Sequence, residues 1–597
     1  MADPDTATAT PPFSAPSLED LQHWTWVMGR AQQMMMEHLA AQMGVAAERA
    51  ADAPAQGAAA WPAMNWFADP AKLMEAQAQM WAEGLNIWQR ALSGPAAGES
   101  SALAAKADKD RRFAAPEWRD NPLFDTIRQT YLLISDRLLG SVDAIEGVDE
   151  ETRGRIRFMT KAFVDAMSPS NFALTNPQVL ERAMETKGES LLHGLEHMLN
   201  DLEKGQLTHT DPDAFEVGRN IATTPGKVIR QTRLYQLIQY APSTETVLAT
   251  PLIIFPPWIN RFYILDLNPK KSFIKWAVDQ GLTVFVISWK SADESLRDVA
   301  LGDYAKAQVE AIDAVREALG VESVHAIGYC VAGTALAATL ALLAARGEAD
   351  KVASATFFTA QVDFSEAGDL KFFLGDEQME LIRQLSADKG YMDGRYMAAT
   401  FNLLRGRDLI WSYVTSNYLM GEDYPQFDLL YWNSDTTNLP AGWHRSYLQQ
   451  LYRDNKLVQP GAIVVDGTPI DLRKVTTPTY VQAGREDHIA PPQSVWKITH
   501  HFAGPLKFVL AGSGHIAGVV NPPEAEKYQY WVNEEKAGTL EAFIAGATET
   551  KGSWWPDWAR WIRDIDGKEV PAKGARVPGK GRLKAIEDAP GSYVKAR

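Results

Sequence analysis

The sequence predicts an α/β protein with a mostly parallel sheet, and two features of the chain beyond about residue 247 support this. Short apolar or β-branched runs recur there, namely "TVLATPLIIFPPW", "LTVFVISW", "SVHAIGYC", "VASATFFTA", "TPTYVQAG" and "LKFVLAG". Most are separated by helix-length segments such as "DYAKAQVEAIDAVREALG". Strands that are apolar throughout and alternate with helices form parallel sheets buried on both faces. We therefore assign residues 241–597 to one α/β domain.

An interval within that domain, from about 365 to 460, interrupts the alternation. It is long, aromatic and irregular, as in "RDLIWSYVTSNYLMGEDYPQFDLLYWNSDTTNLPAGWHRSYLQQLY". We expect it to form a cap inserted over the sheet, since active-site lids are commonly built this way. The alternative is a fixed subdomain that completes the core.

Two regions precede the sheet: an N-terminal extension, 1–116, and a mostly helical domain, 117–240. The first residues are rich in Ala, Pro and Thr, a composition typical of disorder. Helices are expected from Ser17, which can act as an N-cap, and from Asp69. The extension is rich in large apolar residues, namely Met36, Trp61, Trp66, Trp81 and Trp88. They serve either ordinary helix packing or docking on a partner or a hydrophobic particle.

Composition excludes several classes of protein. The net charge of −16 argues against a nucleic-acid partner. A single cysteine among 597 residues leaves no internal disulfide and no cysteine-based zinc cluster, which suits the reducing cytoplasm. The N-terminus has acidic residues and prolines where a signal peptide needs basic and then apolar residues, so we expect no secretion signal. The longest uncharged run, 323–345, contains a turn, so we expect no integral membrane span.

Histidines in the predicted helical domain match one metal-binding pattern. His193, Glu196 and His197 form H-x-x-E-H, the pattern of inverted zinc peptidases. Spacing of i, i+4 places both imidazoles on one helix face. The pattern is short and frequent by chance, so we expect a solvated helix face and no metal.

The lone cysteine lies where a strand is expected to turn into a helix. Cys330 stands in "GYCVAGT", with Gly328 before it and Gly333 after it. This context is typical of the nucleophile elbow, in which small neighbours allow a sharp turn. The helix N-terminus favours a thiolate, and the N–H of Val331 is placed to donate to an oxyanion. The elbow pattern G-x-C-x-G would have glycine where this chain has Ala332, a small residue that still permits the turn.

The elbow requires an acid and a base after later strands, in the order nucleophile, acid, base. Asp487 follows "TYVQAG" and is the expected acid, whereas His515 follows "LKFVLAGSG" and is the expected base. His488 is the rival base, and we interpret His500-His501 as surface or packing residues. The first strand ends in "FPPWINRF", whose two prolines have no N–H. Trp258 or Ile259 is therefore expected to supply the second oxyanion N–H.

A cysteine nucleophile favours thioester chemistry. The acyl-cysteine is itself a thioester, so taking an acyl group from another thioester costs little free energy, and an alcohol then attacks to give a more stable ester. The favoured reaction is acyl transfer from a thioester to a hydroxyl.

Several longer motifs resemble those of the class I polyhydroxyalkanoate synthases, a family of α/β-hydrolase fold. They are "GYCVAGT", "PPWINRFYILDL", "FDLLYWNSDTTNLP", "GREDHIAP", "GSGHIAGVVNPP" and "GSWWPDWARW". The likeness covers about 117 to 565, and glycine is usual in the family at the place of Ala332. The resemblance implies polymerisation of (R)-3-hydroxyacyl-CoA, typically 3-hydroxybutyryl-CoA, into storage polyester with release of CoA. One alternative is a cysteine-dependent thioesterase or polyester hydrolase on the same scaffold. Another is a non-catalytic granule-surface protein, which the presence of all three expected catalytic residues disfavours.

The resemblance also implies the roles of the site residues. Cys330 would carry the acyl group and His515 would deprotonate it, while Asp487 orients His515 or helps to activate the attacking hydroxyl. Val331 and Ile259 would supply the oxyanion N–H groups. No metal or prosthetic cofactor is implied. A homodimer is implied, located in the cytoplasm at polyester granules and in contact with the growing polyester chain, and the interval 365–460 resembles the family's cap.

Overall fold

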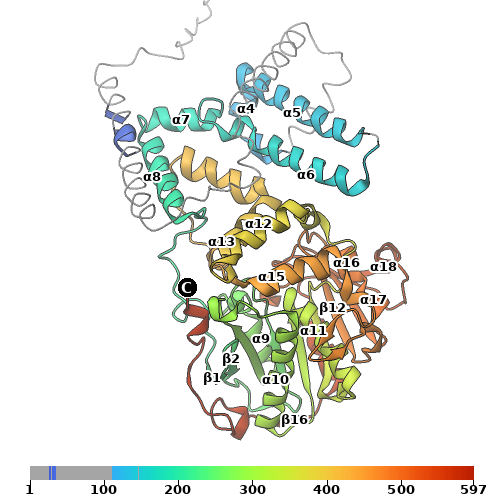
Figure 1. Ribbon diagram of the computed structural model, residues 1–597. Helices are drawn as coiled ribbons and strands as arrows, with labels where there is room; N and C mark the ends of the chain where they lie inside the picture. Colours follow the sequence, from blue (N-terminus) through green and yellow to red (C-terminus); the bar gives the residue numbers. More distant parts are fainter. Residues whose placement is uncertain (1–25, 28–29, 35–109, 146) are drawn as a thin grey trace, which may run out of the picture. The chain divides into compact units, whose positions relative to one another are not determined.

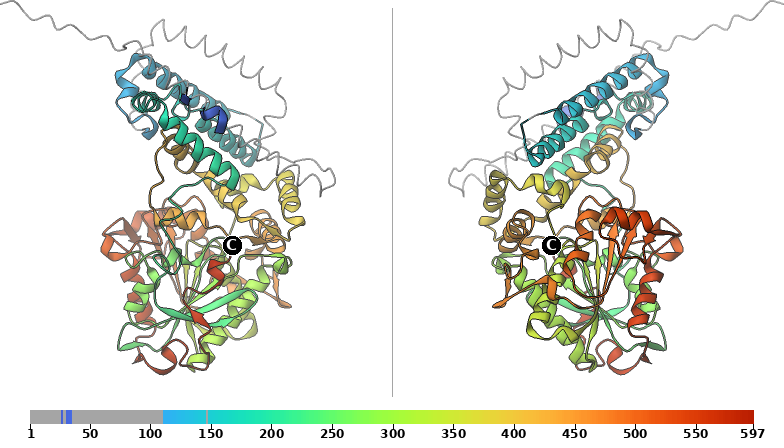
Figure 2. Two further views of the ribbon diagram at one scale, coloured as in Figure 1. Left: turned by 90° about the vertical axis from the view of Figure 1, so that its left-hand side faces the viewer. Right: turned by 90° about the vertical axis from the view of Figure 1, so that its right-hand side faces the viewer.

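The computed structural model describes residues 26–27, 30–34, 110–145 and 147–597, and Figures 1 and 2 show its ribbon from three sides. Contacts divide the chain into two compact units. The first ends at Leu207 and also includes Arg405–Tyr424; the second comprises Thr208–Leu404 and Pro425–Arg597. The expected helix from Ser17 is described only at 26–27 and 30–34, which are helical. The expected helix from Asp69, together with Met36, Trp61, Trp66, Trp81 and Trp88, lies outside the described residues.

The first unit is helical in its described part. Its α-helices are α4 (Glu117–Asp120), α5 (Pro122–Asp143), α6 (Glu150–Ala166), α7 (Pro177–Glu185) and α8 (Glu189–Lys204). The later segment contributes the π-helical turns η8 (Arg407–Trp411) and η9 (Val414–Leu419). Side chains cap three of these helices: Asn121 begins α5, Asp149 begins α6 and Asn176 begins α7. Each cap oxygen accepts a hydrogen bond from an N–H that would otherwise have no partner at the helix start.

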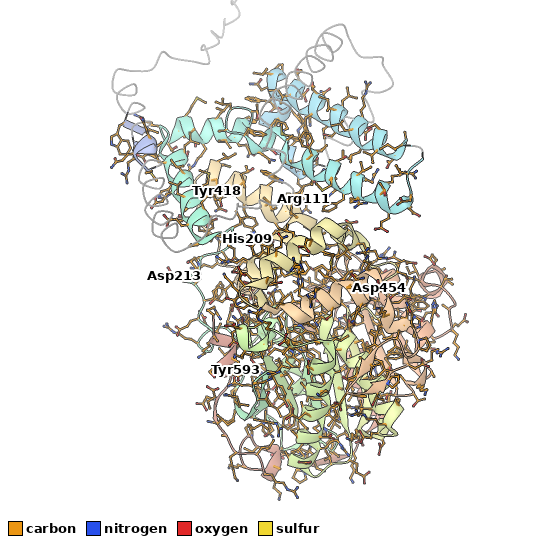
Figure 3. All side chains as sticks on the ribbon, viewed as in Figure 1. Arg111, His209, Asp213, Tyr418, Asp454 and Tyr593 are labelled. Atoms are coloured by element: carbon orange, nitrogen blue, oxygen red, sulfur yellow. The ribbon has the colours of Figure 1, made fainter. Side chains whose placement is uncertain are left out.

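Helix α8 packs closely on η9. A Cβ placed on Gly194 would lie 1.8 Å from the carbonyl oxygen of Tyr418, so only glycine permits this approach. The hydroxyl of Tyr418, which Figure 3 labels, donates to Asp201 at 2.6 Å. Gly194, which lies inside the H-x-x-E-H pattern, therefore has a packing role between α8 and η9.

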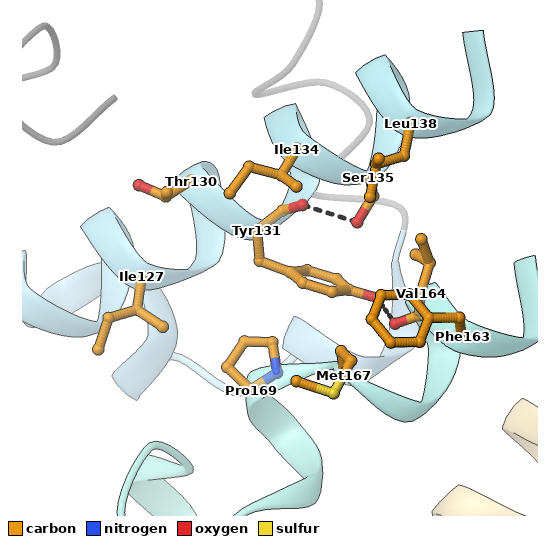
Figure 4. A pocket seen from close by; sticks show the side chains of 10 residues that line it. All are labelled: Ile127, Thr130, Tyr131, Ile134, Ser135, Leu138, Phe163, Val164, Met167 and Pro169. Carbon is orange, nitrogen blue, oxygen red and sulfur yellow. Dashed lines mark hydrogen bonds between the residues drawn. The ribbon is translucent and has the colours of Figure 1, made fainter. Parts of the chain in front are cut away.

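An apolar pocket lies between α5 and α6 (Figure 4). Its lining residues are Ile127, Thr130, Tyr131, Ile134, Ser135, Leu138, Phe163, Val164, Met167 and Pro169. The hydroxyl groups of Tyr131 and Ser135 both donate hydrogen bonds to backbone carbonyls of the same helical unit. The hydroxyl of Tyr131 donates to the Val164 carbonyl at 2.8 Å, and that of Ser135 donates to the Tyr131 carbonyl at 2.7 Å.

The second unit contains an 11-stranded sheet in the order β15-β14-β13-β12-β7-β6-β4-β5-β2-β1-β17. The strands are β1 (Gly226–Gln231), β2 (Tyr235–Tyr240), β4 (Leu252–Phe255), β5 (Val284–Trp289), β6 (Val324–Tyr329), β7 (Val352–Phe358), β12 (Thr479–Gly484), β13 (Leu506–Ala511), β14 (Gln529–Val532), β15 (Thr548–Lys551) and β17 (Glu587–Asp588). The six central strands, from β13 to β5, pair in parallel. The outer strands pair antiparallel. The predicted α/β class is confirmed.

Short two-stranded sheets complete the strand set of this unit. They pair β3 (Thr246–Leu248) with β16 (Glu569–Pro571), β8 (Tyr391–Met392) with β9 (Leu439–Pro440), and β10 (Val464–Val465) with β11 (Thr468–Pro469).

Helices cover both faces of the large sheet, as Figure 2 shows. The helices of this unit are α9 (Phe273–Asp279), α10 (Leu301–Leu319), α11 (Val331–Arg346), α12 (Asp376–Ala387), α13 (Gly394–Leu404), α14 (Asp428–Ser434), α15 (Ala441–Tyr447), α16 (Pro492–Trp496), α17 (Ile498–His501), α18 (Leu540–Gly546) and α19 (Trp555–Ile565). Alternate residues of β4 enter different cores: Ile253 and Phe255 join one cluster, Leu252 and Ile254 the other. This alternation explains why β4 is apolar at every position.

Two features differ from the expected organisation. Strands β1 and β2 lie within 117–240, where we expected helices, and they pair into the sheet. Of the interval 365–460, residues 405–424 group with the helical unit and the rest with the sheet unit. Trp443 of α15 is fully buried in the core shared with α10 and α11. Among the described helices, none combines the length and the apolar character that a bilayer crossing requires.

Candidate active site

Cys330 occupies the sharp turn between β6 and α11. Its φ of 53° lies in the left-handed region that non-glycine residues rarely adopt. The neighbouring strand β7 holds the turn, because the Cys330 N–H donates to the Phe358 carbonyl at 2.9 Å. Backbone strain of this kind persists where surrounding contacts determine it, and it commonly occurs at active sites. The turn places a half-buried thiol at the N-terminus of α11.

Close packing of α11 on β6 explains the two glycines beside the thiol. A Cβ on Gly328 would lie 2.5 Å from the Gly333 Cα, and a Cβ on Gly333 would lie 2.4 Å from the Ala360 Cβ. Ala332 faces a different environment: it is fully buried, and its carbonyl accepts from the Gln308 side chain at 3.0 Å. The close approach therefore depends on Gly333, which is why alanine is tolerated at 332.

Asp487 and His515 form a hydrogen-bonded pair at the same edge of the sheet. Asp487 follows β12 and His515 follows β13, the neighbouring parallel strand. The His515 Nδ1 lies 2.7 Å from the Asp487 Oδ2. The other carboxylate oxygen accepts from the N–H groups of Ile489 at 2.8 Å and Ala490 at 2.9 Å. Both oxygens of Asp487 are thus engaged, and the ring of His515 is fixed in direction.

Charge around His515 favours its protonated form. Burial disfavours the imidazolium, but attraction to Asp487 and Cys330 and hydrogen bonds to both outweigh burial and raise the pKa of His515 to about 10. The structure therefore brings Cys330, Asp487 and His515 together. The carbonyl of His515 is held by the Tyr329 hydroxyl at 3.1 Å.

The two expected oxyanion donors lie on adjacent strand ends. Val331 is the first residue of α11, and Ile259 lies in the loop after β4. Strands β4 and β6 are neighbours, with Phe255 paired to Gly328. Among the described residues, neither the Val331 N–H nor the Ile259 N–H has a hydrogen-bond partner. Their use as oxyanion donors stays a prediction.

Two tyrosines that sequence reasoning did not single out approach the thiol. Cys330 packs against a core cluster that contains Tyr447 and Tyr452. Burial, with smaller contributions from Tyr452 and Cys330, raises the pKa of Tyr447 well above its usual value. Burial and then Cys330 likewise raise the pKa of Tyr452. Both phenols therefore keep their protons. The sequence shows that the interval 365–460 is rich in aromatic residues, but it does not show which of them lie near Cys330.

The other histidines considered in the sequence are His488, His500 and His501. His488 is half-buried, and it is His515 that pairs with Asp487. His501 pairs with Asp363 at 3.2 Å, and His500 approaches the Gly538 carbonyl at 3.3 Å. These two agree with the interpretation as surface or packing residues.

The H-x-x-E-H residues also have a structural explanation. His193 and Glu196 are exposed on α8, as a solvated face would be. His197 instead packs: its Nδ1 lies 3.2 Å from the Asn417 carbonyl, and its ring lies 4.7 Å from that of Tyr424. Within the described part of the chain, no group of three His, Cys, Asp or Glu side chains is arranged to hold a metal ion.

Two family models match parts of this chain. A family model described as "Poly-beta-hydroxybutyrate polymerase (PhaC) N-terminus" matches residues 109–277, and one described as "alpha/beta hydrolase fold" matches residues 251–522. Among solved structures, a putative hydrolase from Agrobacterium vitis S4 is 13% identical, with a TM-score of 0.30, covering 57% of this chain and 97% of its own.

Curated relatives match over much greater lengths. The poly(3-hydroxyalkanoate) polymerase subunit PhaC of Rhizobium meliloti is 46% identical over 537 residues, which is 89% of this chain and 87% of the relative. That of Cupriavidus necator is 42% identical over 535 residues, which is 88% of this chain and 89% of the relative. The chain is therefore a polyester-synthesising enzyme of α/β-hydrolase fold and belongs to the poly(3-hydroxyalkanoate) polymerase family.

Proposed function

We propose that this enzyme polymerises (R)-3-hydroxyacyl-CoA, with 3-hydroxybutyryl-CoA as the expected substrate, through an acyl-enzyme on Cys330. The observation that carries the proposal is the placement of the only cysteine at a strained strand-to-helix turn beside the hydrogen-bonded pair of His515 and Asp487. A thiol in this setting suits exchange between thioesters, and the names of the relatives support a polyester product.

In the first step the Cys330 thiolate attacks the thioester carbonyl. The negative charge that develops on the carbonyl oxygen is stabilised by the N–H groups of Val331 and Ile259. The carbon–sulfur bond to CoA then breaks. The departing CoA thiolate takes the proton held by His515, so that free CoA thiol leaves and the acyl group remains on Cys330. His515 ends this step as neutral imidazole.

In the second step a 3-hydroxyl group attacks the acyl-cysteine. Acylation removes the thiolate charge, which is one cause of the raised pKa of His515. The neutral imidazole is then suited to accept the hydroxyl proton as a general base. The new ester bond forms as the bond to the Cys330 sulfur breaks, which restores the ion pair of thiolate and imidazolium. Asp487 orients His515 in this scheme, because both of its oxygens are already engaged.

The wider setting is part of the same proposal. The growing polyester chain and the granule surface are the expected partners, the enzyme acts in the cytoplasm, and two copies form the active homodimer. Residues 365–460 act as a cap that admits the CoA thioester and excludes water from the acyl-enzyme.

One assay separates synthesis from hydrolysis. Purified enzyme is incubated with (R)-3-hydroxybutyryl-CoA, while thiol release and insoluble polyester are measured together. We expect both, in equal acyl equivalents. Continued thiol release with free 3-hydroxybutyrate and no polyester would instead assign hydrolysis.

A further inference from the structure

The motif "FDLLYWNSDTTNLP" forms hydrogen bonds with the loop that is expected to supply an oxyanion donor. It comprises helix α14 and the residues up to Pro440, and it packs along the loop that follows β4. The Trp432 indole N–H donates to the Arg261 carbonyl at 2.7 Å, and the Thr437 hydroxyl donates to the Trp258 carbonyl at 2.7 Å. Asn260 and Thr436 form an isolated antiparallel bridge between these two contacts.

The contact made by Thr437 acts on one particular peptide group. The carbonyl of Trp258 and the N–H of Ile259 belong to the same planar, trans peptide unit and point in opposite directions. A donor that fixes the carbonyl therefore also fixes the direction of the N–H. It polarises the unit as well, because hydrogen bonds in a chain strengthen one another. Thr437 is buried, so water does not compete for this carbonyl.

We propose that Thr437 is a positioning residue of the oxyanion hole, which aims the Ile259 N–H at the substrate oxygen by holding the Trp258 carbonyl. This inference rests on the proposed function. It concerns acyl transfer and not the generation of the thiolate, since Thr437 makes no contact with Cys330, Asp487 or His515 among its hydrogen bonds in the described chain.

The surroundings hold both partners of this hydrogen bond rigidly. On the loop side, the Trp258 ring stacks on Tyr304 with centroids 3.7 Å apart, and the Trp289 indole donates to the Pro256 carbonyl at 2.7 Å. The loop is therefore fixed at the residues that lead into the peptide that Thr437 contacts.

On the motif side, the buried carboxylate of Asp435 accepts from the Arg261 Nε at 3.2 Å and from the Tyr263 hydroxyl at 2.7 Å. Arg261 also donates to the carbonyls of Ala596 at 2.7 Å and of Tyr593 at 3.3 Å, the second of which is labelled in Figure 3. The segment that carries Thr437 is thus tied to the same loop two residues earlier.

A pair of substitutions isolates the hydroxyl. Thr437→Val preserves the shape of the side chain and removes the donor, whereas Thr437→Ser keeps the donor. Thr479→Val is the matched control, because Thr479 is also buried and donates to a backbone carbonyl, that of Thr477, at 2.9 Å. It lies at the amino end of β12, whereas Asp487 follows the carboxyl end.

Two rates are measured on each full-length variant. The first is the single-turnover acylation of the enzyme by (R)-3-hydroxybutyryl-CoA, followed as CoA release. The second is the alkylation of Cys330 by iodoacetamide, in which the thiolate displaces iodide and no oxyanion forms. Because the chain has one cysteine, the mass of the intact protein reports this site alone.

We expect Thr437→Val to slow acylation by about 10-fold or more, since losing an oxyanion donor outright costs about 10²–10³-fold. Its alkylation rate should stay within about twofold of wild type, and Thr437→Ser should recover most of the acylation rate. The control should match wild type in both rates. Unchanged acylation in Thr437→Val overturns the proposal, as does a parallel fall in both rates, which indicates a structural role. Failure of wild type to form an acyl-enzyme would instead refute the proposed function.

Discussion

Replacing Gly333 by alanine tests the geometry of the nucleophile turn most simply. The added Cβ would lie 2.4 Å from the Ala360 Cβ and 2.8 Å from the Gly328 carbonyl oxygen. Carbon atoms in contact normally lie about 3.5–4.0 Å apart, so α11 must move away from the strand by about 1 Å. Overpacking of this size costs about 1–3 kcal/mol of unfolding free energy. A displacement of about 1 Å at a catalytic group costs about 10²-fold in rate.

The assay compares Gly333→Ala with Ala332→Gly by thermal unfolding and by initial CoA release. Ala332→Gly removes a buried methyl group and costs about 1 kcal/mol, but it creates no overlap, so activity should stay within about twofold of wild type. Gly333→Ala should lose about 10²-fold in activity even at temperatures where it is folded. Wild-type activity in Gly333→Ala would refute the close approach of α11 and β6 as the reason for the glycine.

Further predictions concern charge, the choice of base and the cap. Asp487→Asn should lower the pKa of His515 from about 10 and slow CoA release by about 10⁴-fold, and an unchanged imidazole titration by NMR would contradict the pairing. His515→Gln should lose orders of magnitude more activity than His488→Gln, and the reverse order would make His488 the base. Burial lowers the pKa of His325 to about 4, below the value of about 6.5 in the unfolded chain, so folding stability is lost as pH falls from 6.5 towards 4, by up to about 3 kcal/mol. His325→Gln should flatten this pH dependence in urea unfolding, and an unaltered slope would count against it. Hydrogen exchange in residues 370–450 should change when a non-hydrolysable substrate analogue binds, and unchanged protection there would favour a fixed subdomain.

The sheet was predictable because its strands and helices alternate in sequence. A parallel strand buried on both faces is largely apolar, as β4 is throughout and β6 is apart from His325, and this pattern is visible without a structure. The carboxyl ends of such strands meet at one edge, so Cys330, Asp487 and His515 could be placed near one another from sequence order alone. The sequence could not predict the 2.7 Å separation of His515 and Asp487, nor that both oxygens of Asp487 accept hydrogen bonds.

Other features depend on contacts between segments that are distant in the sequence, so neighbouring residues do not predict them. Strands β1 ("GKVIRQ") and β2 ("YQLIQY") mix polar and apolar residues without regular alternation. They become strands by pairing with each other, and β2 also pairs with β5. The grouping of residues 405–424 with the helical unit rests on several such contacts, among them the close approach at Gly194, which looks like an ordinary helix glycine in sequence, and the hydrogen bond from Tyr418 to Asp201. The need for glycine at 333, and not at 332, likewise appears only when α11 is seen against Ala360.

The central claim is that Cys330 carries the growing acyl group, and one measurement tests it most directly. Enzyme mixed with (R)-3-hydroxybutyryl-CoA is acid-quenched at early times, and the intact protein and its peptides are weighed by mass spectrometry. We predict that the mass increases by whole 3-hydroxybutyryl units, that the added mass resides on the peptide containing Cys330, and that Cys330→Ala shows neither the adduct nor CoA release. CoA release and polyester formation without an adduct, or with an adduct on another residue, would contradict the account.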